Sequence, residues 1–171
     1  DIKKIFKDEN YPILIDQEGG KVSRLNKIID LSIFSQNFFG KSYFKNKKLF
    51  YNSYKIHINM VCDILKKVGI NINTVPVLDV RRKQSHNIIG SRSFSANPIV
   101  VSNLGKLCIH FYESNKIATV IKHVPGLGQS ECDSHFKTPV INDKKAELIK
   151  KDFKPFKECK SLLAMTAHAI Y

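Results

Sequence analysis

Short apolar runs alternate with longer segments of helical periodicity along this chain. The short runs cover 12–15, 72–78, 118–121 and 163–167, and mostly apolar runs of this length are typical of strands buried on both faces of a parallel sheet. Between them, apolar residues recur three or four positions apart from Phe50 to Val68 and from Val101 to Phe111, which predicts two helices. The alternation of strand and helix predicts an α/β fold with a parallel sheet.

The ends of the expected helices carry recognisable signals. Gly69 supplies a C-terminal stop for the first helix, and the second follows Pro98. Asp143 is expected to cap a helix from 144 to 151, and Pro155 to open another.

Polar residues follow each apolar run. Asp16, Asp79, the pair Lys122 and His123, and His168 stand at the four ends. Active sites of (β/α)₈ (TIM) barrels lie at the carboxyl ends of the strands, so these residues are expected at one end of such a barrel. A complete barrel needs about 250 residues, whereas this chain has 171. We therefore expect one domain, residues 1–171, that is an incomplete (β/α)₈ barrel without its first and last elements.

The net charge of +13 raises the possibility of a nucleic-acid-binding module, with steeply salt-dependent binding. Only four of the 28 basic residues are Arg, however, and the Lys residues are spread over the whole length. Phosphate and base recognition favours clustered Arg. A solvated, Lys-rich surface is therefore the expected explanation, and no nucleic-acid partner is expected.

No stretch approaches the roughly 20 apolar residues of a membrane span, and the charged residues 1–10 show no signal peptide. Cys62, Cys108, Cys132 and Cys159 lie far apart, which suggests neither a zinc site nor a disulfide framework. We expect reduced, mostly buried thiols in a cytoplasmic protein without a membrane partner.

Three stretches contain the candidate chemistry: 15–25, 75–94, and 122–128 with 133–140. Taken singly, each residue in them has an ordinary explanation as a turn, a surface or a buried polar residue. Together they provide the charged donors and acceptors that sugar hydroxyls require. The expected substrate-binding residues are Asp16, Arg24, Arg92, Lys122 and His123.

The segment from Pro125 to Pro139, with Gly126 and Gly128, lacks any period and is expected to be a mobile loop. Asp133 stands two residues before His135 and can orient its imidazole, which with an ordinary pKa of about 6.5 can serve as acid and base. With Cys132 these residues weakly resemble metal ligands, but the ligand spacing is missing, so neither metal nor other cofactor is expected.

These stretches, in this order, resemble the signature of the family 3 glycoside hydrolases over essentially the whole chain. The Asp-Ser-His triplet at 133–135 resembles the β-N-acetylglucosaminidase branch, although Leu127 and Lys21 stand where relatives commonly have His and Arg. The resemblance implies a retaining mechanism through a covalent glycosyl-enzyme, with His135 as acid/base and Asp133 as its orienting partner. It places the nucleophile, an Asp in a Ser-Asp motif, beyond Tyr171, so residues 1–171 alone are expected not to turn over substrate.

The expected function is release of terminal β-linked N-acetylglucosamine from peptidoglycan fragments, such as muropeptides, during cell-wall recycling, by a monomer in the bacterial cytoplasm. A family 3 β-glucosidase is the enzymatic alternative, but those relatives lack the Asp-x-His loop and place a carboxylic acid on a later domain. A non-catalytic homologue is the third possibility.

Overall fold

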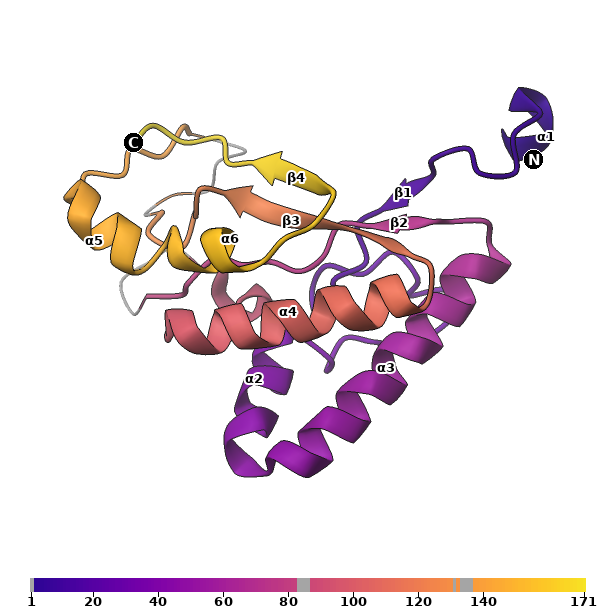
Figure 1. Cartoon of the computed structure of the whole chain (residues 1–171), viewed down its shortest axis with the longest axis horizontal. Helices are drawn as coiled ribbons and strands as arrows, with labels where there is room; N and C mark the ends of the chain where they lie inside the picture. Colours follow the sequence, from indigo (N-terminus) through magenta and orange to yellow (C-terminus); the bar gives the residue numbers. More distant parts are fainter. Residues whose placement is uncertain (1, 83–86, 131, 133–136) are drawn as a thin grey trace.

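The chain folds around a four-stranded parallel sheet, seen in a computed structural model that describes residues 2–82, 87–130, 132 and 137–171 (Figure 1). The strands lie in chain order, β1 (Leu14–Ile15), β2 (Ile72–Asn73), β3 (Ala118–Val124) and β4 (Leu163–Thr166). Every neighbouring pair is parallel. The predicted α/β fold is therefore confirmed. The sheet is open, and the edge strand β4 is exposed along its length.

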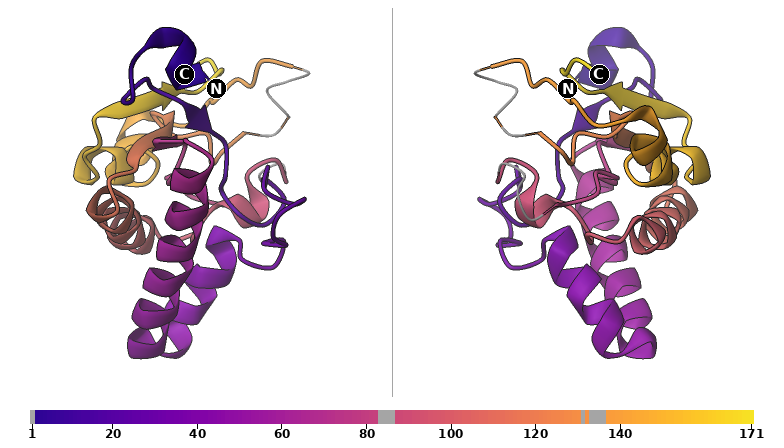
Figure 2. Two further views of the ribbon diagram at one scale, coloured as in Figure 1. Left: turned by 90° about the vertical axis from the view of Figure 1, so that its right-hand side faces the viewer. Right: turned by 90° about the vertical axis from the view of Figure 1, so that its left-hand side faces the viewer.

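Helices cover the connections between the strands. Within the described ranges they are α1 (Ile2–Phe6), α2 (Gln36–Lys45), α3 (Lys47–Lys67), α4 (Pro98–Ser114), α5 (Lys145–Lys150) and α6 (Lys154–Glu158), with a 3₁₀ turn at Gly90–Arg92. Figures 1 and 2 show α3 and α4 packed on the same side of the sheet, with α2 against α3. The right-hand end of Figure 1 shows α1 projecting away from this body.

The two long helices confirm the predicted periodicity. At the end of α3, Gly69 has a φ of +82°, and Ile70 N–H donates to the Leu65 carbonyl at 2.9 Å, a C-terminal arrangement that favours glycine. The α4 helix begins at Pro98, and the Asn97 side chain accepts from Ile99 N–H. The end of α3 and the start of α4 therefore lie where the sequence predicts them.

The apolar faces of α3 and α4 form the core with the sheet. The buried side chains from these helices include Phe50, Tyr54, Ile58, Val61, Leu65, Val101, Leu104 and Phe111. Cys62, Cys108 and Cys159 are buried as predicted, and burial raises the pKa of the Cys62 and Cys108 thiols to about 12. Three of the four cysteines are thus part of the packing.

One local prediction is wrong, and another is confirmed only in part. Asp143 does not cap α5, because this helix begins at Lys145 without a side-chain cap. The Asp143 carboxylate instead lies 3.5 Å from Arg82 Nη1. The strand predicted over 72–78 is regular only over β2, Ile72–Asn73. Pro76 has no N–H for a ladder, but beyond it Val77 pairs with Lys122 in an isolated parallel bridge, and Leu78 N–H donates to the Lys122 carbonyl at 2.7 Å.

Other local predictions are confirmed. Pro155 lies in the first turn of α6. The described residues between Pro125 and Pro139 contain neither helix nor strand, as expected for a loop. The expected mobility of this loop remains a prediction.

Candidate active site

The carboxyl ends of β1 and β3 bring a carboxylate and an ammonium group together. Asp16 directly follows β1, and Lys122 lies near the end of β3. Lys122 Nζ lies 2.5 Å from Asp16 Oδ1, so the prediction that both lie at one end of the sheet is confirmed. His168 follows β4, which runs parallel to β3, and is exposed at the same end.

The Lys122 ammonium has an acceptor for each of its three hydrogens. Besides Asp16, its Nζ lies 2.6 Å from Glu18 Oε1 and 3.0 Å from Thr74 Oγ1. The Thr74 hydroxyl in turn donates to Asp16. Because an ammonium group has only three donors, the buried Lys122 acts here mainly by holding two carboxylates, and Asp16 is the partner that faces outward, with its side chain 39% exposed.

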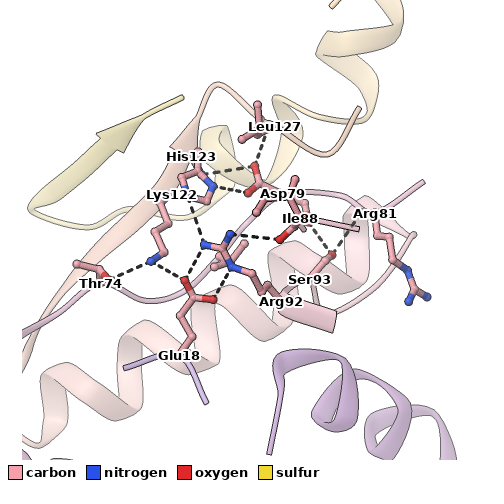
Figure 3. Close-up of polar contacts among 12 residues, drawn as sticks. Glu18, Thr74, Asp79, Arg81, Ile88, Arg92, Ser93, Lys122, His123 and Leu127 are labelled. Carbon is pink, nitrogen blue, oxygen red and sulfur yellow. Dashed lines mark hydrogen bonds and ion pairs between the residues drawn. The ribbon is translucent and has the colours of Figure 1, made fainter. Parts of the chain in front are cut away.

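Glu18 lies at the centre of the cluster, between Lys122 and Arg92 (Figure 3). Its side chain is fully buried. Arg92 Nε and Nη2 each lie 2.8 Å from one Glu18 oxygen, which is the bidentate arrangement of strong Arg–carboxylate pairs. One buried carboxylate therefore positions two of the expected substrate-binding residues, a role that the sequence pattern did not indicate.

The turn that carries Glu18 depends on glycine. Glu18 N–H donates to the Val22 carbonyl at 3.0 Å, and Gly19 and Gly20 have φ angles of +84° and +60°. A Cβ on Gly19 would lie 2.4 Å from the Phe34 carbonyl oxygen. The two glycines thus allow the chain to reverse while Glu18 points into the cluster.

Asp79 positions His123. Its Oδ2 lies 2.6 Å from His123 Nδ1, and its Oδ1 accepts from Leu127 N–H at 2.6 Å (Figure 3). A carboxylate on Nδ1 favours the tautomer with the proton on that nitrogen. The other ring nitrogen, Nε2, then lies 3.5 Å from Arg92 Nη2.

An irregularity in the sheet accompanies the site. Lys122 and His123 are consecutive in β3, where side chains ordinarily point to opposite faces, yet both belong to the cluster. The register between β3 and β4 shifts between Lys122 and Val124. Irregularities of this kind redirect side chains and are frequent beside functional sites.

Opposite charges keep Asp16 and Arg92 ionised. Burial raises the pKa of Asp16, but hydrogen bonds with Lys122 and Thr74 and the charge of Arg92 outweigh it, so the pKa lies below its ordinary value. Burial lowers the pKa of Arg92, but the hydrogen bond and the charge of Glu18 raise it by more, so this pKa lies above its ordinary value. Asp16 is therefore an ionised, half-exposed acceptor at neutral pH, which suits hydrogen-bonding to two neighbouring hydroxyls.

The remaining expected residues have different outcomes. The Arg24 side chain is exposed and makes no hydrogen bond to a described residue; only its backbone N–H is held, by Gln17 Oε1 at 2.8 Å. Asp133 and His135 lie outside the described residues. Within the described ranges, no group of three or more His, Cys, Asp or Glu side chains is arranged to hold a metal ion.

A separate apolar groove of about 550 Å³ lies between α2 and α3. Phe34, Phe38 and Leu49 line it, together with His57, whose pKa burial lowers to about 4. The lining contains none of the charged residues of the cluster. The groove is therefore distinct from the candidate active site.

The chain is similar to known proteins of one family. The N-terminal domain of glycosyl hydrolase family 3 matches residues 9–171. The chain is 32% identical over 163 residues to beta-hexosaminidase A of Pseudoalteromonas piscicida, covering 93% of this chain and 27% of that protein. It is 30% identical over 162 residues to a beta-hexosaminidase of Nitrosomonas eutropha, covering 93% of this chain and 46% of that protein.

Solved structures are similar as well. NagZ from Neisseria gonorrhoeae, in complex with N-trifluoroacetyl-D-glucosamine, aligns with a TM-score of 0.84 at 28% identity, covering 94% of this chain and 48% of that chain. A family 3 beta-N-acetylglucosaminidase from a Paenibacillus species aligns with a TM-score of 0.78 at 29% identity, covering 93% and 30%.

The open parallel sheet with its helices is a fragment of a (β/α)₈ barrel, as predicted. The chain belongs to glycosyl hydrolase family 3, through the N-terminal domain of that family. It spans less than half the length of the relatives named above. No helix in the described part of the chain is long and apolar enough to cross a bilayer.

Proposed function

We propose that this chain is part of a retaining β-N-acetylglucosaminidase. The observation that carries the proposal is the cluster of Asp16, Lys122, Glu18, Arg92 and His123 at the carboxyl end of the sheet of a family 3 domain. This is the end where barrel enzymes bind substrate. Residues 1–171 form part of one catalytic barrel domain in this proposal.

Asp16, Arg24, Arg92, Lys122 and His123 form the subsite for the non-reducing sugar. Asp16 is the half-exposed acceptor, and the described hydrogen bonds of Arg92 leave one Nη1 hydrogen for a ligand, because Nη1 contacts only the Ile88 carbonyl, at 3.3 Å. His123 Nε2 lies beside that guanidinium. Asp16 can therefore accept from one hydroxyl and Arg92 can donate to its neighbour, while Lys122 holds Asp16 in place.

The acid/base is His135, oriented by Asp133, and the nucleophile is an Asp in a Ser-Asp motif encoded after Tyr171. A His protonates the departing oxygen in the first half of the reaction and activates water in the second. The Asp-Ser-His triplet of the β-N-acetylglucosaminidase branch supports this assignment over a β-glucosidase.

The substrate is proposed to be a peptidoglycan fragment with a terminal β-linked N-acetylglucosamine, hydrolysed during cell-wall recycling by a monomer in the cytoplasm. The relatives' names support the sugar, since two are beta-hexosaminidases and one was solved with N-trifluoroacetyl-D-glucosamine. The proposal requires no metal, no nucleic acid and no membrane partner.

Asp16→Ala tests the subsite in the protein encoded by the complete gene. Hydrogen bonds with a charged partner contribute roughly 1.5–3 kcal/mol, so kcat/KM for an aryl N-acetyl-β-glucosaminide is expected to fall by about one to two powers of ten. The matched control is Asp63→Ala, which removes an Asp on α3 whose side chain is 62% exposed. Equal kcat/KM values for the two variants would remove Asp16 from the sugar site.

A further inference from the structure

The start of the loop after β3 is fixed by the elements around it. The Gly126 carbonyl accepts from Tyr171 OH at 2.8 Å, and Leu127 N–H donates to Asp79 at 2.6 Å. Gly126 has a φ of +137°, and a Cβ there would lie 2.9 Å from both Cβ and the carbonyl oxygen of Asp152. The chain thus passes close against Asp152 at this point.

The next two residues are held as well. A Cβ on Gly128 would lie 2.0 Å from the Val80 carbonyl oxygen, so the backbones approach closely there. Gln129 Nε2 donates to Asp152 Oδ2 at 3.1 Å. Residues 126–129, which we call the loop root, are therefore in contact with surrounding segments at every position.

Asp152 connects three segments of the chain. It lies between α5 and α6, its side chain is fully buried, and Arg82 Nη2 donates to Oδ2 at 2.8 Å. Arg82 belongs to the segment after β2, and Gln129 to the loop root. A buried carboxylate is costly without a cation. Burial raises the pKa of Asp152 above its ordinary value, and the charge and hydrogen bond of Arg82 oppose that rise. Among the described residues, Asp152 Oδ1 has no hydrogen-bond partner.

We infer that Asp152 is a positioning residue for the hydrolytic reaction: paired with Arg82, it fixes Gln129 and so the loop root from which the chain continues to Asp133 and His135. The inference rests on the proposed role of His135 as the acid. An acid on a loop protonates efficiently only if the loop begins from a fixed place, and a shift of about 1 Å at a catalytic group can cost about 10²-fold in rate.

The test uses Gln129→Leu in the protein encoded by the complete gene. This variant removes the contact between the loop and Asp152 but keeps the Arg82–Asp152 pair. For a β-N-acetylglucosaminide with a poor leaving group, which needs protonation, kcat/KM is expected to fall about 10- to 100-fold. For one with a good leaving group it should change little. Asp152→Asn is expected to lower kcat/KM for the poor leaving group in the same way. If Asp152→Asn does not fold, Gln129→Leu alone still tests the inference.

The matched control is Asp143→Asn, which removes the other carboxylate near Arg82, 3.5 Å from Nη1, without touching Gln129. Its rates should stay near those of the wild type with both substrates. If Gln129→Leu slows both substrates equally, or neither, the contact has only a structural role and the inference is overturned while the proposed function stands. A wild-type protein that cleaves neither substrate would overturn the proposed function, and the inference with it.

Discussion

Replacing His135 by alanine in the protein encoded by the complete gene is expected to slow cleavage of a poor-leaving-group N-acetyl-β-glucosaminide by about 10²–10⁴-fold. This range is the usual cost of losing general acid/base assistance. The departing oxygen of such a substrate must receive a proton as the glycosidic bond breaks, whereas a good leaving group departs as an anion. The defect in forming the glycosyl-enzyme should therefore be much smaller with a good leaving group.

Single-turnover kinetics separate formation of the glycosyl-enzyme from its hydrolysis. The control variant is His110→Ala, which removes an exposed His on α4 and should leave both steps unchanged. Equal slowing of the two substrates by His135→Ala, or no slowing of either, would show that His135 is a binding contact or an ordinary loop residue.

Among the substitutions proposed for this protein, Glu18→Ala should lower the free energy of unfolding the most. Glu18 is the buried counterion of both Arg92 and Lys122, at 2.8 and 2.6 Å. Removing one partner of a buried ion pair leaves an uncompensated charge and typically costs about 3–5 kcal/mol. Lys122 retains Asp16, but Arg92 loses both of its charge-assisted bonds from Nε and Nη2.

The free energy of unfolding, from urea titration monitored by circular dichroism, measures this effect. Glu147→Ala is the control, because Glu147 pairs with Lys151 on the exposed face of α5 and its removal should leave the free energy nearly unchanged. Similar unfolding midpoints for the two variants would contradict the central role given to Glu18. Glu18→Gln, which keeps the shape and removes the charge, should also be destabilised relative to the wild type.

Much of the fold can be predicted from the sequence because its signals are local. The periodicity of α3 and α4 continues over several turns, and Gly69 and Pro98 mark boundaries that the backbone itself requires. The α2 helix was missed because its buried residues include the polar Gln36 and Asn37, which obscure an apolar stripe. Gln36 can be buried because its amide donates to the Val77 carbonyl at 2.8 Å and accepts from Val77 N–H at 3.0 Å. No local sequence pattern shows this long-range contact.

The site shows the same limit. Asp16 and Lys122 were predicted to meet because both follow apolar runs, and they do. Glu18 was missed because its role depends on two cations brought from 74 residues away or more in the chain. One signal could have found it: the expected substrate-binding residues include the cations Arg24, Arg92 and Lys122 but a single carboxylate, Asp16, and cations that become buried require counterions. Arg24, in contrast, stands close to this turn in the sequence, yet its side chain is exposed.

The position of a bound sugar tests the central claim most directly. We expect a crystal structure of the complete protein with N-acetylglucosamine to place the ring hydroxyls within hydrogen-bond distance, about 2.5–3.2 Å, of Asp16 and of the Arg92–His123 pair. The Lys122–Glu18 contact should be retained in that complex. A sugar bound elsewhere, for example in the apolar groove between α2 and α3, with Asp16 free of contact, would contradict the account.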